Sequence, residues 1–351
     1  MLTSTATGLE TDSHNVLRRI LDATREGVLV VGEEMCVTAG NKAAHRSFSD
    51  PHTPLEGRAV NEVIENEAVL TAFKEACLRG KTSDIHLEYG SKGKRSYDVH
   101  VAPIELDGSR QAIGYFYDVT QVHRLETIRQ EFLSNISHEL RTPLTSILAF
   151  VETLEEGALE DAENNRHFLS IIRRNGERMR NLIADILELS QIESGNIALK
   201  RKDVKLGQLV DDILTSLSSM AATREITLIN EIEPSSTVLA DRKRLEQMLT
   251  NLVDNAIRFN RRGGSVTVAD SLVPGKHFIY VSDTGEGILP EQIHRIFERF
   301  YRVDRARSRD IGGTGLGLAI VKHLARLHRG EVSVESKLSV GTKFTIDLPS
   351  K

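Results

Sequence analysis

The sequence has 351 residues, of which 40% are apolar and 27% are charged, and its formal net charge is −5. This length and this balance favour two or three soluble domains, each with an apolar core. They argue against nucleic acid as the main partner, because phosphate binding needs clustered cations and the sequence has no long basic run.

Neither the cysteines nor the apolar runs indicate a secreted or membrane-spanning chain. Cys36 and Cys77 lack metal-ligand spacing, so we expect reduced and buried thiols. The N-terminus lacks a signal-peptide core, and no apolar run approaches the ~20 residues that a membrane helix needs. We therefore expect a cytoplasmic protein that senses an internal signal, unless a membrane segment or a membrane partner lies outside this sequence.

Residues 13–120 have the pattern of a small α+β domain. Apolar runs predict strands at Val28–Val31 and Cys36–Thr38, and helices are expected at residues 60–79. Alternating apolar positions predict three further strands, separated by polar turns. These strands are centred on Ile85–Tyr89, Tyr97–Val101 and Tyr115–Tyr117, and their turns are Ser91–Lys94 and Asp107-Gly108.

Two histidines, His86 and His100, lie in the predicted strands of this domain. Histidine is a common ligand for metals and cofactors. A strand histidine without a ligand is the more frequent case, however, and we favour it here. An unknown small ligand in this domain stays open, since no residue identifies one.

Residues 121–196 predict two long amphipathic helices. The first runs from Gln121 to about Leu154, and Gly157 with the polar residues 160–165 separates it from a second helix, which ends near Gly195. Two antiparallel helices bury little surface, whereas two copies form a four-helix bundle with one shared core. We therefore expect a homodimer through these helices.

A polar cluster lies on the first of these helices. His138 and Thr142 are four residues apart and so share one helix face, with Glu139 adjacent to His138. Pro143 has no N–H to donate to the Glu139 carbonyl, so we expect the helix to bend or loosen beside His138. An exposed imidazole near a carboxylate and a hydroxyl indicates chemistry, although a lone histidine on a polar face is more often incidental.

From residue 203 onward, helices alternate with strands, which predicts an α/β sandwich with helices on one face of a single sheet. The predicted helices cover residues 206–220 and 242–259. The predicted strands cover residues 226–229, 266–268, 277–281, 332–336 and 343–348.

An asparagine motif, NLVDNAIRF, lies on the second of these helices. Asn251 and Asn255 are one helical turn apart and face the same way. Mg²⁺ prefers oxygen ligands together with substrate phosphates, and an amide oxygen suits that role. Arg258 could neutralise phosphate charge. Asparagines in a helix are otherwise simply solvated, so the motif alone is ambiguous.

Two glycine-containing motifs follow. Asp283 opens DTGEGI, and its carboxylate can accept strong hydrogen bonds, while Gly285 and Gly287 allow a close approach of the backbone because they lack a Cβ. GGTGLGL precedes a helix, whose N-terminal N–H groups can hold phosphate. It is not a Walker A loop, because no Lys-Ser/Thr pair follows its glycines. Its residues are Gly312, Gly313, Thr314, Gly315, Leu316, Gly317 and Leu318.

An aromatic and basic segment, Ile296–Asp310, lies between these two motifs. Phe297 and Phe300 are expected to anchor a mobile cover that closes over the nucleotide. The segment's arginines could reach phosphates or the partner helix, but we expect most of them to be solvated. These arginines are Arg299, Arg302, Arg305, Arg307 and Arg309.

The order of the motifs resembles that of sensor histidine kinases over residues 121–351. HELRTPLTSI, which starts at His138, resembles the phosphoacceptor motif, and the asparagine, DxGxG, phenylalanine-rich and GxGxG motifs follow in the family's order. The preceding domain resembles a PAS sensor, with Asp118–Thr120 as its exit motif.

The resemblance implies a multidomain α+β protein. Its parts are a PAS sensor at residues 13–120, an antiparallel helical hairpin that dimerises into a four-helix bundle at residues 121–196, and an ATP-binding α/β sandwich at residues 203–351. The last domain resembles the superfamily that includes gyrase, a heat-shock chaperone family, histidine kinases and the mismatch-repair protein MutL.

The resemblance also implies residue roles. His138 would be phosphorylated by ATP and would pass the phosphoryl group to an aspartate of a response regulator. Glu139 would assist proton transfer, and Thr142 would orient a water that dephosphorylates the regulator. Asn255 would bind Mg²⁺, and Asp283 would bind adenine. The remaining implied ATP-site residues are Asn251 near the phosphates, Arg258 where many relatives have lysine, Gly285, Gly287, and Gly313, Thr314, Gly315, Leu316 and Gly317.

Two other functions stay open at this point. An ATPase-type chaperone or DNA-repair protein would share the ATP-binding superfamily, but the histidine helix argues against it. A catalytically silent sensor would use only the PAS domain and the dimer helices, and it would not need the intact nucleotide motifs.

Overall fold

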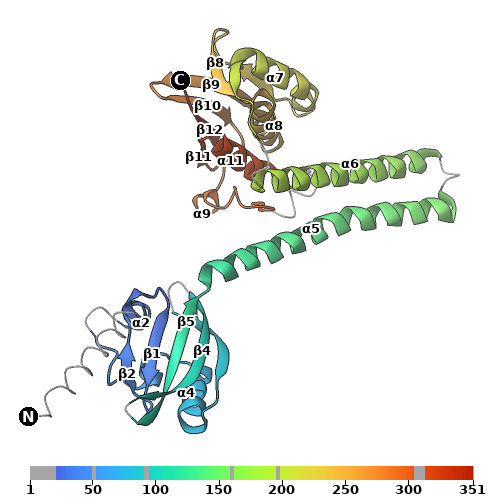
Figure 1. Cartoon of the computed structure of the whole chain (residues 1–351). Coiled ribbons are helices and arrows are strands. Elements are labelled where there is room, and N and C mark those ends of the chain that lie inside the picture. Colours follow the sequence, from blue (N-terminus) through green and yellow to red (C-terminus); the bar gives the residue numbers. More distant parts are fainter. Residues whose placement is uncertain are drawn as a thin grey trace, which may run out of the picture. The chain divides into compact units, whose positions relative to one another are not determined.

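In the computed structural model, the described residues are 21–49, 53–90, 95–106, 108–158, 162–194, 198–303 and 313–350. The chain forms two compact units that divide between Glu131 and Phe132, and helix α5 (Thr120–Thr153) continues through that boundary (Figure 1). Of the helices in this part of the chain, none combines the length and the apolar character that a bilayer crossing requires.

The first unit contains a five-stranded antiparallel sheet in the order β2-β1-β5-β4-β3. Its strands are β1 (Gly27–Val31), β2 (Val37–Gly40), β3 (Ser83–Tyr89), β4 (Arg95–Leu106) and β5 (Ser109–Asp118). Its helices are α2 (Lys42–Phe48), α3 (Val60–Val63) and α4 (Glu67–Arg79). The strands predicted from the apolar pattern are confirmed, while the predicted turn at 91–94 and Asp107 lie outside the described residues.

One face of this sheet packs against α4 to form the core, in which Phe73, Val99 and Phe116 are buried. The sequence pattern does not predict α2, because this helix has only seven residues and its apolar side chains are few. Both cysteines are free thiols. Cys77 is buried as expected, but Cys36 is partly exposed because it lies in an isolated bridge at the sheet margin, so the expectation of burial is wrong there.

The long helices of the second unit form an antiparallel pair. α5 ends in a π-helical turn (Leu154–Ala158), and α6 covers Ala162–Glu193. Asn175 Nδ2 donates to Ser146 Oγ at 3.3 Å across the pair. α5 runs to Thr153 as predicted and continues through Pro143. α6 starts before Asn164, so the predicted break at residues 160–165 is too long.

The remainder of the second unit is an α/β sandwich. Its main sheet has the order β11-β12-β10-β9-β7, and a second sheet pairs β6 with β8. The strands are β6 (Lys202–Lys205), β7 (Thr227–Asn230), β8 (Thr237–Ala240), β9 (Ser265–Val273), β10 (Lys276–Asp283), β11 (Glu331–Lys337) and β12 (Gly341–Pro349). The helices are α7 (Leu206–Thr223), α8 (Arg242–Arg258), α9 (Pro290–Ile293) and α11 (Gly317–Leu327).

Only one face of the main sheet is fully buried. Ile279, Val281 and Ile346 point to the core, whereas the alternating Phe278 and Tyr280 stay partly exposed. Helices α7, α8 and α11 cover the buried face (Figure 1). The predicted helices and strands are confirmed, but the pattern does not predict β6 and β8, whose four residues each are too few for clear alternation.

Candidate phosphotransfer and nucleotide site

His138 is exposed on α5, where an attacking ring nitrogen would be accessible. Thr142 lies one turn further along and is also exposed, and its hydroxyl donates to the His138 carbonyl at 3.2 Å. This hydrogen bond lies within α5, and its donor Thr142 comes directly before Pro143, which is buried. The predicted common face of His138 and Thr142 is therefore present and open.

Glu139, beside His138, is half-buried and held by two arginines. Arg178 on α6 donates to its Oε2 at 3.0 Å, and Arg302 donates to the same oxygen at 3.1 Å. The Arg302 side chain is only 9% exposed, so this is a shielded contact. Arg302 also donates to the Gly313 carbonyl. The Arg302 guanidinium thus connects Glu139, the residue next to His138, to Gly313 at the start of the glycine loop.

The glycine loop is shaped by close backbone contacts. Gly315 has a φ of +74°, and a Cβ there would lie 2.9 Å from the Cα of Phe300. The Phe300 N–H donates to the Gly315 carbonyl at 2.9 Å, so glycine is required at this position. Leu316 is fully buried and anchors the loop through its side chain, which leaves the backbone as the part that can meet a phosphate.

Thr314 ties the same loop to α6. Its hydroxyl donates to Asp185 Oδ2 at 2.8 Å. Burial raises the pKa of Asp185, the Thr314 hydrogen bond lowers it, and the nearby Glu188 charge raises it further. Glu188 in turn accepts from Arg244 and Gln247 on α8. The nucleotide domain is therefore docked on α6 through polar contacts as well as apolar ones.

The asparagine helix meets the end of this loop. Asn251 Nδ2 donates to the Gly317 carbonyl at 3.4 Å, and Asn255 is half-buried one turn further along α8. Arg258 Nε contacts Asp254 Oδ2 at 2.6 Å, so its charge is already balanced by a carboxylate on its own helix. The structure thus brings Asn251 and the loop together.

Asp283 lies at the end of β10 and is largely buried. Its Oδ1 accepts hydrogen bonds from the backbone N–H groups of Gly285 at 2.8 Å and Thr342 at 3.2 Å. Burial raises the pKa of Asp283 to about 6, although these two hydrogen bonds oppose the shift. The carboxylate is therefore held in one orientation without a cation among its hydrogen-bond partners.

The two glycines after Asp283 are required by the protein's own packing. A Cβ at Gly285 would lie 2.4 Å from the Phe259 carbonyl oxygen, and one at Gly287 would lie 2.2 Å from that of Lys337. Gly287 also has a φ of +71°. These contacts fix the loop that follows Asp283 against α8 and β11, and so fix the wall of the site.

The described part of the basic segment before the glycine loop, residues 296–303, contacts the long helices. Phe300 packs against Phe132 with ring centroids 5.8 Å apart, and Arg299 lies 5.1 Å from the Phe132 ring. Arg299 and Arg302 are not simply solvated, because each pairs with a carboxylate on the long helices, while the expectation that most of the five arginines are solvated stays a prediction. Arg305, Arg307 and Arg309 lie outside the described residues.

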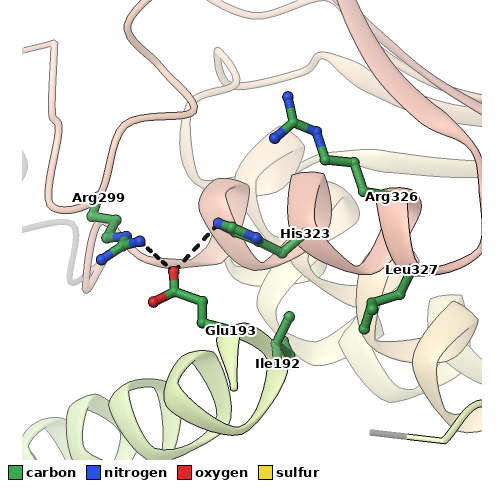
Figure 2. A pocket seen from close by; sticks show the side chains of 6 residues that line it. All are labelled: Ile192, Glu193, Arg299, His323, Arg326 and Leu327. Atoms are coloured by element: carbon green, nitrogen blue, oxygen red, sulfur yellow. Dashed lines mark ion pairs between the residues drawn. The ribbon is translucent and has the colours of Figure 1, made fainter. Parts of the chain in front are cut away.

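A separate open hollow of ≈ 460 Å³ lies where α6 ends against α11 (Figure 2). Glu193 pairs there with both Arg299 and His323. Burial lowers the pKa of His323, and the Glu193 charge opposes this shift. The residues predicted to bind ATP do not line this hollow. We therefore assign its residues to the contact between α6 and the ATP-binding domain. The hollow is lined by Ile192, Glu193, Arg299, His323, Arg326 and Leu327.

Four charged residues near the site were not predicted from the sequence: Arg178, Asp185, Glu188 and Glu193. All four lie on α6, within a helix recognised only as amphipathic. Their partners are far along the chain, so local spacing gives no signal for them. Half-buried charges on an amphipathic helix would have been the available hint.

Three family models match the chain. The PAS fold matches residues 21–124, the His Kinase A (phospho-acceptor) domain matches residues 128–195, and the histidine kinase-, DNA gyrase B- and HSP90-like ATPase matches residues 240–351. The fold and the site thus define a PAS-linked phosphoacceptor and ATPase protein, and the match to the ATPase family implies that this domain binds ATP.

The most similar curated proteins include the sensor histidine kinase WalK of Bacillus subtilis (strain 168), which is 35% identical over 344 residues, 95% of this chain and 53% of WalK. The sensor protein SrrB of Staphylococcus aureus (strain MRSA252) is 27% identical over 96% of this chain and 56% of SrrB. The chain has PAS, His Kinase A and histidine kinase-type ATPase domains and is similar to these sensor histidine kinases, and it spans about half their length.

Solved structures share the fold. Histidine kinase ThkA in complex with the response regulator protein TrrA aligns with a TM-score of 0.52 and 22% identity, over 95% of this chain and 98% of that chain. The Acinetobacter baumannii histidine kinase AdeS aligns with a TM-score of 0.52 and 24% identity, over 61% of this chain and 98% of that chain.

Proposed function

We propose that this protein is an ATP-dependent protein-histidine kinase of a two-component system. It phosphorylates His138 and passes the phosphoryl group to an aspartate of a response regulator. One observation carries the proposal: Arg302 bridges the Gly313 carbonyl and the carboxylate of Glu139, so the loop expected to hold ATP lies beside the exposed His138.

The residues around the glycine loop fit ATP and Mg²⁺. Asp283 offers a fixed carboxylate oxygen to the adenine amino group. The backbone of Gly313–Gly317 precedes α11 and can donate to phosphate oxygens. The side-chain oxygen of Asn255, with Asn251 nearby, is of the type that Mg²⁺ prefers. Bound Mg²⁺ would supply charge neutralisation on the phosphates.

The chemical step needs a neutral imidazole and a proton acceptor. A ring nitrogen of His138 attacks the γ-phosphorus, the bond to the ADP oxygen breaks, and its electron pair leaves with ADP. Glu139 takes the proton from the other ring nitrogen or stabilises the charge on the ring. Because two arginines now neutralise Glu139, the arrangement is a resting one, and the kinase reaction requires Arg302 to release this carboxylate.

The assembly that we propose is a homodimer through α5 and α6, which would also present His138 to the regulator. Its support is a set of large apolar side chains that stay more than two-fifths exposed on the helix pair. They are Leu133, Leu144 and Leu148 on α5 and Leu169, Ile183 and Leu187 on α6. A second copy that covered them would complete a four-helix core.

The test is incubation with ATP labelled at the γ-phosphate, followed by acid and base treatment. We expect label that is lost in acid and kept in base, as for phosphohistidine, and His138→Gln should abolish it while nucleotide binding persists. His167→Gln, which replaces another exposed histidine of the helix pair, should leave labelling unchanged. Acid-stable label, or label that survives His138→Gln, would disprove the proposed acceptor.

A further inference from the structure

Two cross-strand pairs of histidine and aspartate lie on the exposed face of β3 and β4. His86 is directly opposite Asp98, and Asp84 is directly opposite His100. The Nδ1–Oδ1 distances are 2.9 Å for His86 and Asp98 and 2.6 Å for His100 and Asp84. Both pairs face away from the core residues that alternate with them, so both are accessible.

A third group, His123 on α5, joins only one of these pairs. The His123 ring lies on the His86 ring with centroids 4.5 Å apart and planes 27° apart. The potential ligand atoms of His86, Asp98 and His123 all lie within 4.8 Å of one another. Among the described residues, this is the one group of three or more His, Cys, Asp or Glu side chains that meets this criterion.

The position of His123 is set by the backbone around it. The Val119 N–H donates to the Ser96 carbonyl at 2.9 Å, and the Ser96 N–H donates to Thr120 Oγ1 at 3.0 Å. The His123 N–H then donates to the Val119 carbonyl at 2.9 Å. The first turn of α5 is therefore attached to β4, and this attachment holds the His123 side chain over the His86–Asp98 pair.

This donor set has a definite metal preference. Two imidazole nitrogens and one carboxylate oxygen suit Zn²⁺ and neighbouring first-row transition metals, whereas Mg²⁺ and Ca²⁺ prefer oxygen ligands alone. Bonds of about 2.0–2.2 Å to a common ion would need the three ligand atoms to change their spacing, which exposed side chains can do by rotation.

We propose that His86, Asp98 and His123 bind one divalent transition-metal ion of the Zn²⁺ type, with water in the remaining coordination position. The site joins two strands of the PAS sheet to the first turn of α5. Metal binding would therefore stabilise this junction, because the bound state holds ligands from three elements together. The inference does not depend on the proposed kinase activity.

The experiment is a calorimetric Zn²⁺ titration of the whole chain, stripped of metal and in the presence of a competing chelator. One equivalent should bind, and His123→Ala should weaken its affinity by at least about tenfold, the loss that follows removal of even an outer partner of a metal ligand. His100→Ala breaks the other histidine–aspartate pair, which lacks a third ligand among the described residues, and should leave the affinity unchanged.

Thermal unfolding without metal checks that both variants stay folded, which we expect because His123 is exposed and the His100 side chain is 40% exposed. Bound Zn²⁺ should raise the unfolding temperature of the parent and of His100→Ala, but not that of His123→Ala. The proposal is overturned if no equivalent binds, or if the two variants lose affinity to the same extent.

Discussion

Glu139 and Asp283 are both carboxylates with a proposed role in the reaction, but the protein holds them in opposite ways. Glu139 accepts from two guanidinium groups, Arg178 and Arg302, which come from different parts of the second unit. Among the described residues, Asp283 accepts from the backbone N–H groups of Gly285 and Thr342 alone, and burial raises its pKa.

The difference matches what each group is expected to do. Backbone donors cannot rotate away, so Asp283 is fixed before the nucleotide arrives and waits for one donor, the adenine amino group. Side-chain arginines can exchange partners, so Glu139 can be neutralised in one state and released in another. Nucleotide recognition thus depends on a rigid contact, and proton transfer on a reversible one.

The largest expected effect concerns the rigid contact. Asp283→Asn keeps an oxygen for the two N–H donors but places an amide NH₂ where adenine needs an acceptor. Since hydrogen bonds to charged groups contribute about 1.5–3 kcal/mol, we expect ATP affinity to fall by about 10- to 150-fold. The measurement is calorimetry with a non-hydrolysable ATP analogue well above pH 6.

The same substitution has a pH signature. The proton competes with adenine for the free Asp283 carboxyl, so the affinity of the parent should fall as pH drops below about 6. Asp283→Asn cannot titrate and should lose this dependence. The raised pKa also means that Asp283 stabilises the fold most at low pH and that this contribution is lost as pH rises through about 6. The variant should therefore be no less stable than the parent above pH 6, and an unfolded variant would contradict the argument.

A smaller effect is expected for the reversible contact. Arg302→Ala removes one of the two guanidinium groups on Glu139 and its link to the Gly313 carbonyl, while Arg178 still pairs with this carboxylate, so we expect the autophosphorylation rate to rise several-fold. Arg178→Ala removes the other guanidinium but leaves the bridge to the loop, so its rate should change less. Single-turnover labelling of His138 with saturating ATP measures both. A lower rate for Arg302→Ala would mean that this arginine serves the active state and that the resting assignment is wrong.

The sequence was sufficient for elements whose side chains repeat along the chain. The strands of the two five-stranded sheets and the helices α5, α7, α8 and α11 follow from apolar periodicity, and Asp283 and the glycine loop follow from motif order. The roles of the individual site residues stay predictions. The pattern was insufficient for α2, β6 and β8, which are too short to show a period.

The partners of Glu139 could not have been predicted in this way. Arg178 is 39 residues from Glu139 and Arg302 is 163 residues away, so no local spacing relates them. The ion pairs of Arg299 and Arg302 could not be predicted for the same reason: in the sequence both belong to a basic run, and only the docking of the ATP-binding domain on the long helices supplies Glu193 and Glu139 as partners. The sequence shows which residues are charged, but only the fold shows which of them form ion pairs across long stretches of chain.

The smallest expected effect concerns Thr142, whose proposed role differs from those of Glu139 and Asp283. Its hydroxyl donates to the His138 carbonyl within α5, and the side chain is exposed, so Thr142→Ala should change the unfolding temperature little. Autophosphorylation should also change little, because the proposed step uses the ring of His138 and the carboxylate of Glu139. Dephosphorylation of a phosphorylated regulator should slow more, since it would lose the hydroxyl that orients water. Thr142→Ser keeps that hydroxyl and should retain both activities. Equal losses of both activities in Thr142→Ala would instead show that the residue only shapes the helix around His138.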